Sequence, residues 1–282
     1  MTPSQLTTSE RLTGTRITHA VQLSAVAQTY TSKRGTHTAV SDVDLVIDEG
    51  QFVSVVGPSG CGKSTLLYMI AGLRPPTSGQ VSVLGTTVDA RSGPHPDVGF
   101  VFQRDALLPW RTSLQNVALG LRYRGESKTD AAAEAKDWLA RVGLAGFEDS
   151  YPHQLSGGMR KRVSIAASLV LKPRVLLMDE PFSALDAQTR NLMENDLLEL
   201  WAETRQTVVF VTHDLEEAVG LSDRVVTLTR GPGTVLTDRI VPISRPRNLL
   251  ELRFDSEFTR MHEQLWSDLR DQVTPIAPGS ER

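Results

Sequence analysis

Short apolar runs of strand length alternate with polar, glycine-rich connections along most of the chain. Val21–Tyr30 and Ala39–Ile47 alternate loosely between apolar and polar residues and are followed by turn residues, Asp48-Glu49-Gly50 after the second. A period of two is typical of strands, so we predict an antiparallel pair here. Further strands are predicted over Gln51–Val56, Val81–Leu84, Val98–Phe102, Val175–Met178, Val208–Val211 and Val225–Thr229.

Helical segments separate these strands. We predict helices over Ser64–Ala71, which Gly72 ends, and over Asp130–Val142, Asn191–Thr204, Leu215–Leu221 and Ser256–Gln272. Strands that alternate with helices indicate a mainly parallel sheet. Strand signals are few between Leu114 and Leu171, so we expect a helical insertion over about residues 104–170 within an α/β core, and a helical tail over 246–282.

Composition narrows the class of protein. The 282 residues are 40% hydrophobic and carry a formal net charge of −3, so no basic field favours nucleic acid as a partner. No run of about 18 apolar residues would span a membrane. Residues 1–19 are rich in Thr and Ser and lack the apolar stretch of a signal peptide, so we expect a disordered lead. The single cysteine fits a reducing compartment.

A phosphate-binding loop follows the strand that ends at Val56. Gly57 to Ser64 match the pattern G-x-x-x-x-G-K-[ST], between a predicted strand and a predicted helix. Glycines let successive N–H groups turn toward phosphate oxygens, and the helix N-terminus adds partial positive charge. Lys63 would reach the β- and γ-phosphates, and the Ser64 hydroxyl would bind Mg²⁺. The nucleotide-binding candidates are Gly57, Pro58, Ser59, Gly60, Cys61, Gly62, Lys63, Ser64 and Thr65. For Cys61, a small residue whose backbone N–H contributes is the simpler interpretation than a redox role.

Two carboxylates follow the apolar run Val175–Met178. Asp179 and Glu180 would lie at the carboxyl end of the sheet, beside the phosphate-binding loop. Asp179 would hold Mg²⁺, directly or through water. Glu180 would polarise the attacking water as general base.

A second anion-binding nest is predicted at Ser156-Gly157-Gly158, before the basic residues Arg160 to Arg162. Here the sequence Leu155-Ser156-Gly157-Gly158-Met159 resembles the LSGGQ signature of the ATP-binding cassette (ABC) family, with Met159 in place of the usual Gln. The resemblance implies a head-to-tail dimer, in which each ATP lies between one subunit's phosphate loop and the other's signature. Residues Ser156, Gly157 and Gly158 would then bind the nucleotide of the partner.

Other positions match the family in order along the chain. Gln103 resembles the Q-loop glutamine, which contacts Mg²⁺ and water. The segment Ser183 to Asp186 resembles the D-loop, which crosses the dimer interface. His213 resembles the switch histidine, which contacts the γ-phosphate, and Tyr30 resembles the aromatic residue that stacks on adenine. Taken alone, such a Tyr or His at a strand end is more often a packing or surface residue.

The resemblance covers roughly residues 20–245 and implies a P-loop NTPase (RecA-like) α/β core with an antiparallel β subdomain and an inserted α-helical subdomain. It implies an ATPase that uses ATP and Mg²⁺ at the cytoplasmic face of the membrane. Its partners would be a second cassette, permease subunits and, indirectly, a periplasmic or lipid-anchored solute-binding protein. The strings Leu107 to Thr112, Met178 to Asp186 and Pro242 to Arg247 look like those of importers for nitrate, sulfonate, taurine or bicarbonate.

Two other classes of P-loop protein share some of these motifs. A non-transport ABC-type ATPase would usually have paired cassettes or coiled-coil insertions, and a P-loop GTPase would need an N-K-x-D string, which does not occur. Leu107, Leu108 and Trp110 either form a groove for the permease or pack inside the helical insertion.

Overall fold

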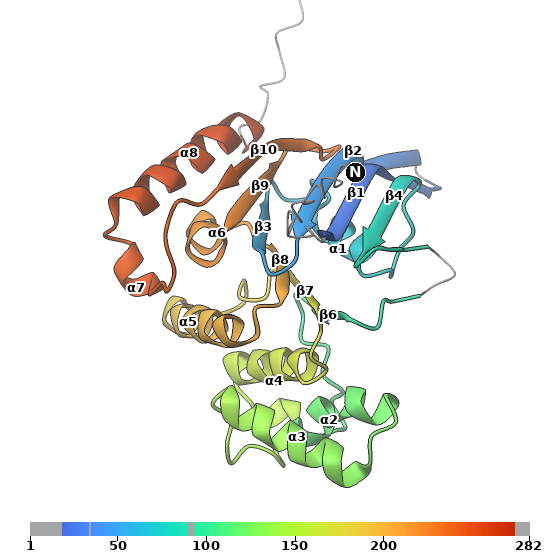
Figure 1. Ribbon diagram of the computed structural model, residues 1–282, viewed down its shortest axis with the longest axis vertical. Helices are drawn as coiled ribbons and strands as arrows, with labels where there is room; N and C mark the ends of the chain where they lie inside the picture. Colours follow the sequence, from blue (N-terminus) through green and yellow to red (C-terminus); the bar gives the residue numbers. More distant parts are fainter. Residues whose placement is uncertain (1–18, 34, 90–92, 274–282) are drawn as a thin grey trace, which may run out of the picture.

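The larger of two sheets forms the centre of the fold. The computed structural model describes residues 19–33, 35–89 and 93–273, and Figure 1 shows the arrangement of their elements. In spatial order the strands are β10 (Val235–Ile240), β9 (Arg224–Leu228), β3 (Phe52–Val56), β8 (Thr207–Val211), β7 (Val175–Asp179) and β6 (Val98–Val101). The last five run parallel, and β10 pairs antiparallel with β9 at the edge.

Burial on both faces explains the continuous apolar runs of the central strands. Every residue of β3, β7 and β8 is buried. Alternate side chains enter two different cores: Val208 and Phe210 of β8 face one, and Val209 and Val211 face the other. A parallel sheet covered on both faces needs apolar residues at nearly every position.

The smaller sheet is antiparallel throughout. Its order is β2 (Gly35–Asp48), β1 (His19–Ser32), β4 (Ser78–Val83) and β5 (Thr86–Thr87). The predicted antiparallel pair is confirmed, and both strands extend beyond the predicted bounds as far as the pair Ser32 and Gly35. The predicted lead over 1–19 lies outside the described residues apart from His19, which begins β1.

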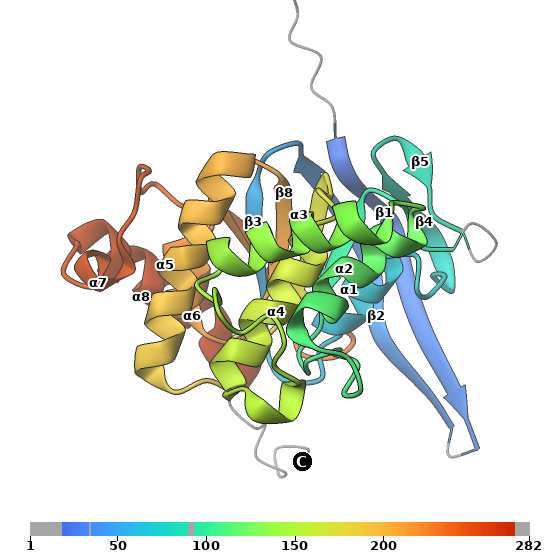
Figure 2. The ribbon, with the colours of Figure 1, turned by 90° about the horizontal axis from the view of Figure 1, so that it is seen from below.

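Three helices between β6 and β7 form a separate group at the end of the molecule opposite the smaller sheet (Figures 1 and 2). These are α2 (Ser113–Tyr123), α3 (Lys128–Arg141) and α4 (Gly157–Leu169), with the short turn η1 (Pro152–Gln154) before α4. Side chains of Thr112, Ser127 and Ser156 cap their N-termini by accepting backbone N–H groups. Such caps satisfy donors that a helix cannot pair internally and fix where each helix begins.

The remaining helices pack around the larger sheet, with α7 against α5. They are α1 (Lys63–Ile70), α5 (Ala187–Thr204), α6 (Leu215–Leu221), α7 (Leu249–Leu252) and α8 (Ser256–Val273). The tail helix α8 packs on α6 and β9 and buries Phe258, Met261, Leu265 and Leu269 in the core. The strands β5 and β10 and the helix α7 were not predicted, because their runs are short or polar on the exposed face.

Candidate nucleotide site

The turn between β3 and α1 contains the predicted phosphate-binding loop. Gly62 caps α1 with a φ of 100°, and a Cβ added there would lie 2.4 Å from Cγ1 of Val40 and 2.8 Å from the Ala39 carbonyl oxygen. Only glycine fits this left-handed, crowded position. The loop therefore packs its backbone against β2 and leaves the N-terminus of α1 facing a groove.

Lys63 is held inside this loop. Its side chain is buried, and Nζ donates to the carbonyl oxygens of Gly57 at 2.8 Å and Pro58 at 3.1 Å. The loop thus surrounds a fixed positive charge that can attract an anion. Burial raises the pKa of the nearby Cys61 thiol, which keeps it neutral and fits the interpretation of Cys61 as a small packing residue.

Ser64 and Asp179 join the loop to the end of β7. Ser64 Oγ donates to Asp179 Oδ1 at 2.9 Å. Asp179 is 3% exposed, and this burial raises the pKa of its carboxyl, while the hydrogen bond from Ser64 opposes the shift. Two of the three side chains that the sequence analysis assigned to metal binding therefore lie side by side.

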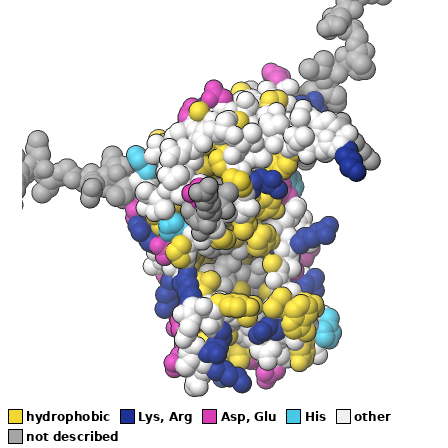
Figure 3. Space-filling view, turned by 90° about the vertical axis from the view of Figure 1, so that its right-hand side faces the viewer, with side chains coloured by type: hydrophobic (Ala, Val, Ile, Leu, Met, Phe, Trp, Pro, Cys, Tyr) yellow, Lys and Arg dark blue, Asp and Glu magenta, His cyan; other side chains and the backbone are white. Residues whose placement is uncertain are grey.

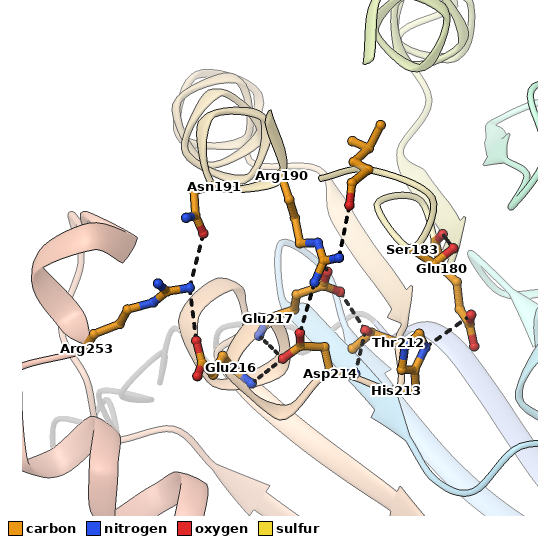
Figure 4. A network of polar contacts seen from close by, with 11 residues as sticks. Glu180, Ser183, Arg190, Asn191, Thr212, His213, Asp214, Glu216, Glu217 and Arg253 are labelled. Atoms are coloured by element: carbon orange, nitrogen blue, oxygen red, sulfur yellow. Dashed lines mark hydrogen bonds and ion pairs between the residues drawn. The ribbon is translucent and has the colours of Figure 1, made fainter. Parts of the chain in front are cut away.

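The carboxylate of Glu180 is the meeting point of three strand ends. Gln103, which follows β6, donates from Nε2 to Oε2 of Glu180 at 3.1 Å. His213, which follows β8, places Nδ1 3.2 Å from the same oxygen, as Figure 4 shows. Glu180 has a positive φ of 41°, and its N–H donates to the Val211 carbonyl oxygen, so β8 fixes the backbone of this residue. The structure thus brings together the three residues predicted to act in catalysis.

An open groove of about 500 Å³ connects Glu180 and Gln103 to Tyr30, whereas His213 does not line it. The Tyr30 hydroxyl lies 3.1 Å from Oγ1 of Thr65, and the guanidinium of Arg74 lies over its ring at 4.8 Å from the centroid. The groove is lined by Tyr30, His37, Ala39, Ser59, Gly60, Gly62, Lys63, Ser64, Thr65, Gln103 and Glu180.

His37 and Arg74 were missed by sequence analysis. His37 pairs with Tyr30 across the β1–β2 hairpin, so the register of that hairpin was the signal that could have found it. Arg74 follows the end of α1, and no local pattern relates it to a ring in β1. Its position depends on how the smaller sheet packs on α1.

The predicted signature segment lies apart from this groove. Ser156 caps α4 by accepting from Met159 N at 3.3 Å, and a Cβ on Gly157 would meet nothing closer than 3.8 Å. Residues Ser156 to Gly158 are not among those that line the groove. Lys161, one turn further, donates to the Phe102 and Gln103 carbonyl oxygens at 3.0 Å, which ties the start of α4 to the segment containing Gln103.

Comparisons with known proteins agree with this geometry. A family model described as ABC transporter matches residues 40–183. The bicarbonate transport ATP-binding protein CmpD of Synechocystis sp. is 46% identical, over 79% of each chain. The nitrate import ATP-binding protein NrtD of the same organism is 40% identical, over 90% of this chain and 96% of that protein. The taurine import ATP-binding protein TauB of Burkholderia pseudomallei is 43% identical, over 89% and 97%.

A solved structure gives the same picture. An ATP-binding cassette in a dimeric post-hydrolysis state, bound to ADP and Pi, matches with a TM-score of 0.71 and 35% identity, over 79% of this chain and 100% of that one. Fold and site define a P-loop ATPase. The chain belongs to the ABC transporter family. The predicted α/β fold class and ATPase activity are confirmed at this level.

Proposed function

We propose that this chain is the ATPase subunit of an importer for a small anionic solute and hydrolyses ATP between two copies of itself. The observation that carries the proposal is the Glu180 carboxylate, which contacts both Gln103 and His213 beside the phosphate-binding loop. Three strands contribute to one reacting position, as expected at the carboxyl end of a parallel sheet.

ATP would lie along the groove from Tyr30 to Glu180. The Tyr30 ring offers a face for adenine, and N–H groups of the loop from Gly57 to Thr65 would bind the phosphates. Lys63 would exchange its two loop carbonyl partners for phosphate oxygens, which are stronger acceptors because they carry charge.

The oxygen donors near Ser64 fit Mg²⁺. Ser64 Oγ and Asp179 Oδ1 are already 2.9 Å apart. The side-chain amide of Gln103, which donates to the neighbouring Glu180, carries a further oxygen that could bind the ion. Hard oxygen ligands of this kind, together with substrate phosphates, are the ligands that Mg²⁺ prefers. Bound there, the ion would neutralise charge on the phosphates during transfer.

Hydrolysis needs a base next to the γ-phosphate. Glu180 follows the buried Asp179 directly, and its side chain is only 20% exposed. From this position its carboxylate can accept the proton of an attacking water. Gln103 and His213 both contact the same oxygen of Glu180, so they would orient the base and place two polar groups near the transferred phosphate.

The second half of the site would come from another copy. Ser156, Gly157 and Gly158 begin a helix with free N–H groups, yet they do not line the groove of their own chain. A helix N-terminus of this kind binds phosphate well. The dimeric arrangement of the solved ATP-binding cassette supports such a pairing.

Transport would require separate membrane subunits. Among the described residues, no helix combines the length and apolar character that crossing a membrane demands. The importer names of the curated relatives favour transport over a non-transport ATPase, and they suggest a nitrate-, taurine- or bicarbonate-like solute. The chain would then act at the cytoplasmic face of the membrane and bind a permease. A periplasmic or lipid-anchored binding protein would deliver the solute to that permease.

Purification with the permease tests this proposal. The candidate permease would be co-expressed with the chain, reconstituted in vesicles and supplied with solute-binding protein. We expect ATP hydrolysis to rise when nitrate, taurine or bicarbonate is added, and labelled solute to accumulate. If the chain hydrolyses ATP but binds no permease, the result would favour the non-transport ATPase instead.

A further inference from the structure

Arg190 contacts two segments that flank the Glu180–His213 pair. It lies in the first turn of α5 and does not line the nucleotide groove. Its Nη2 donates to the Leu185 carbonyl oxygen at 3.1 Å, and its Nη1 donates to Asp214 Oδ2 at 3.3 Å (Figure 4). One guanidinium therefore connects chain segments that come from the ends of β7 and β8.

Both segments are tied to the reacting residues. Leu185 belongs to the segment Ser183 to Asp186, and Ser183 Oγ donates to the Glu180 carbonyl oxygen at 3.0 Å. Asp214 directly follows His213, whose Nδ1 lies 3.2 Å from the Glu180 carboxylate. A shift of the segment 183–186 would thus reach His213 by two routes, through Glu180 and through Arg190.

Both carboxylate oxygens of Asp214 accept hydrogen bonds. Its Oδ1 accepts from the N–H groups of Glu216 and Glu217 and so caps α6, while its Oδ2 is left for Arg190. On the other side of His213, Thr212 Oγ1 accepts from Asp214 N at 3.0 Å and donates to Glu217 Oε2 at 2.6 Å. The backbone on both sides of His213 is therefore held, and Arg190 links this unit directly to α5 through Asp214.

Buried acids surround Arg190. Glu194 and Glu217 are 4% and 5% exposed, and Arg190 Nε lies 3.9 Å from Glu217 Oε1. A lysine would supply the same charge from one point. The planar fork of arginine can donate to a carbonyl and a carboxylate at once, which a lysine cannot do in a fixed geometry. The site therefore requires the shape of the guanidinium as well as its charge.

We infer that Arg190 is a positioning residue for hydrolysis, which holds His213 in place against Glu180 and transmits the position of the segment 183–186 to it. The inference rests on the proposed hydrolysis at Glu180. In a dimer closed around ATP, a copy that displaced the segment 183–186 would move His213 through this side chain.

Steady-state ATPase kinetics of purified Arg190→Lys and Arg190→Met proteins test the inference. We expect kcat to fall at least about tenfold in both, with KM and ATP-binding stoichiometry near wild type, because Arg190 does not touch the groove. Rates are expressed per ATP-binding site, so unfolded protein, which binds no ATP, does not lower the kcat that is calculated. The matched control is Arg253→Met, which removes contacts to Glu216 and Asn191 at the edge of the same network and should keep wild-type kcat.

A second variant keeps the inference testable if Arg190→Met does not fold. Asp214→Asn can retain the α6 cap through its amide oxygen while it loses the ion pair with Arg190. We expect the same fall in kcat, and the double variant with Arg190→Lys should be no slower than either single one. Wild-type kcat in Arg190→Lys, or effects that multiply in the double variant, would overturn the inference. A wild-type chain without ATPase activity would instead refute the proposed function.

Discussion

Ser64 Oγ donates a hydrogen bond of 2.9 Å to Asp179 Oδ1, although 115 residues separate the two along the chain. The contact closes the gap between the N-terminus of α1 and the carboxyl end of β7. It also places the buried Asp179 carboxyl, whose pKa is raised by burial, where a cation would stabilise its charged form. The next residue, Glu180, lines the groove.

Glu180→Gln should separate ATP binding from hydrolysis. The amide keeps the size of the side chain but cannot accept a proton from water, so we expect kcat to fall at least about 10²-fold with ATP affinity retained. ATP-bound dimer should accumulate and be visible by light scattering. Glu203→Gln, at an exposed position, is the control and should turn over normally. Normal turnover by Glu180→Gln would exclude this residue as the base.

Lys63→Ala should abolish tight ATP binding. The substitution removes the charge at the centre of the phosphate-binding loop and leaves the Gly57 and Pro58 carbonyl oxygens without this donor. Titration with a fluorescent ATP analogue measures the loss, which we expect to be at least about 10²-fold in Kd, since charge-assisted phosphate contacts are strong. Lys172→Ala, whose side chain is 72% exposed, should bind as wild type. Retained micromolar affinity in Lys63→Ala would contradict its assigned role.

Trp110 is the residue of the segment 107–110 that we expect to contact the permease. The structure distinguishes the members of this segment: Leu107 is partly buried against the core that the helical group shares with the larger sheet, whereas Trp110 is 70% exposed. Hydrophobic side chains gather on the helical part at the bottom of Figure 3, below a hollow in the surface. Exposed apolar groups of this kind often mark interaction sites.

Trp110→Ala should therefore weaken permease binding and leave the ATPase activity of the isolated chain unchanged. Pull-down with the co-expressed permease measures the first, and phosphate release measures the second. Phe254→Ala, at a residue that is 92% exposed on another part of the surface, is the control. Equal recovery of permease with both variants would show that Trp110 lies outside the interface.

Glu194→Gln should stabilise the fold increasingly as pH rises. Burial and the neighbouring Glu217 raise the pKa of the Glu194 carboxyl to about 8, from an ordinary 4.5. Between these values the folded chain keeps a proton that the unfolded chain has lost, so wild-type stability falls as pH increases. Glutamine is neutral at every pH and escapes this loss.

The melting temperature of Glu194→Gln should thus exceed that of wild type by a gap that widens between about pH 5 and pH 8. Each kcal/mol regained corresponds to roughly 2–4 °C in a domain of this size. Glu199→Gln, on an exposed face of the same helix, should show no such trend. A constant or narrowing gap would mean that Glu194 is ionised in the folded chain.

The amino-acid sequence alone determined the local features of this protein. Five parallel strands, the phosphate-binding loop and the antiparallel pair follow from apolar runs, glycine positions and spacing, because these depend on neighbouring residues. The family resemblance correctly placed the fold, and the comparisons confirmed it. The α8 helix was also predicted, over Ser256–Gln272 against the observed Ser256–Val273.

The tertiary structure decided which of these segments contact one another. The convergence of Gln103 and His213 on one oxygen of Glu180, the stacking of Arg74 on Tyr30 and the link made by Arg190 all join residues far apart in sequence. No local spacing encodes such contacts, since strand order and helix packing set them. Strand order and helix packing also place the segment Ser156 to Gly158, at the start of α4, outside the groove that contains Lys63.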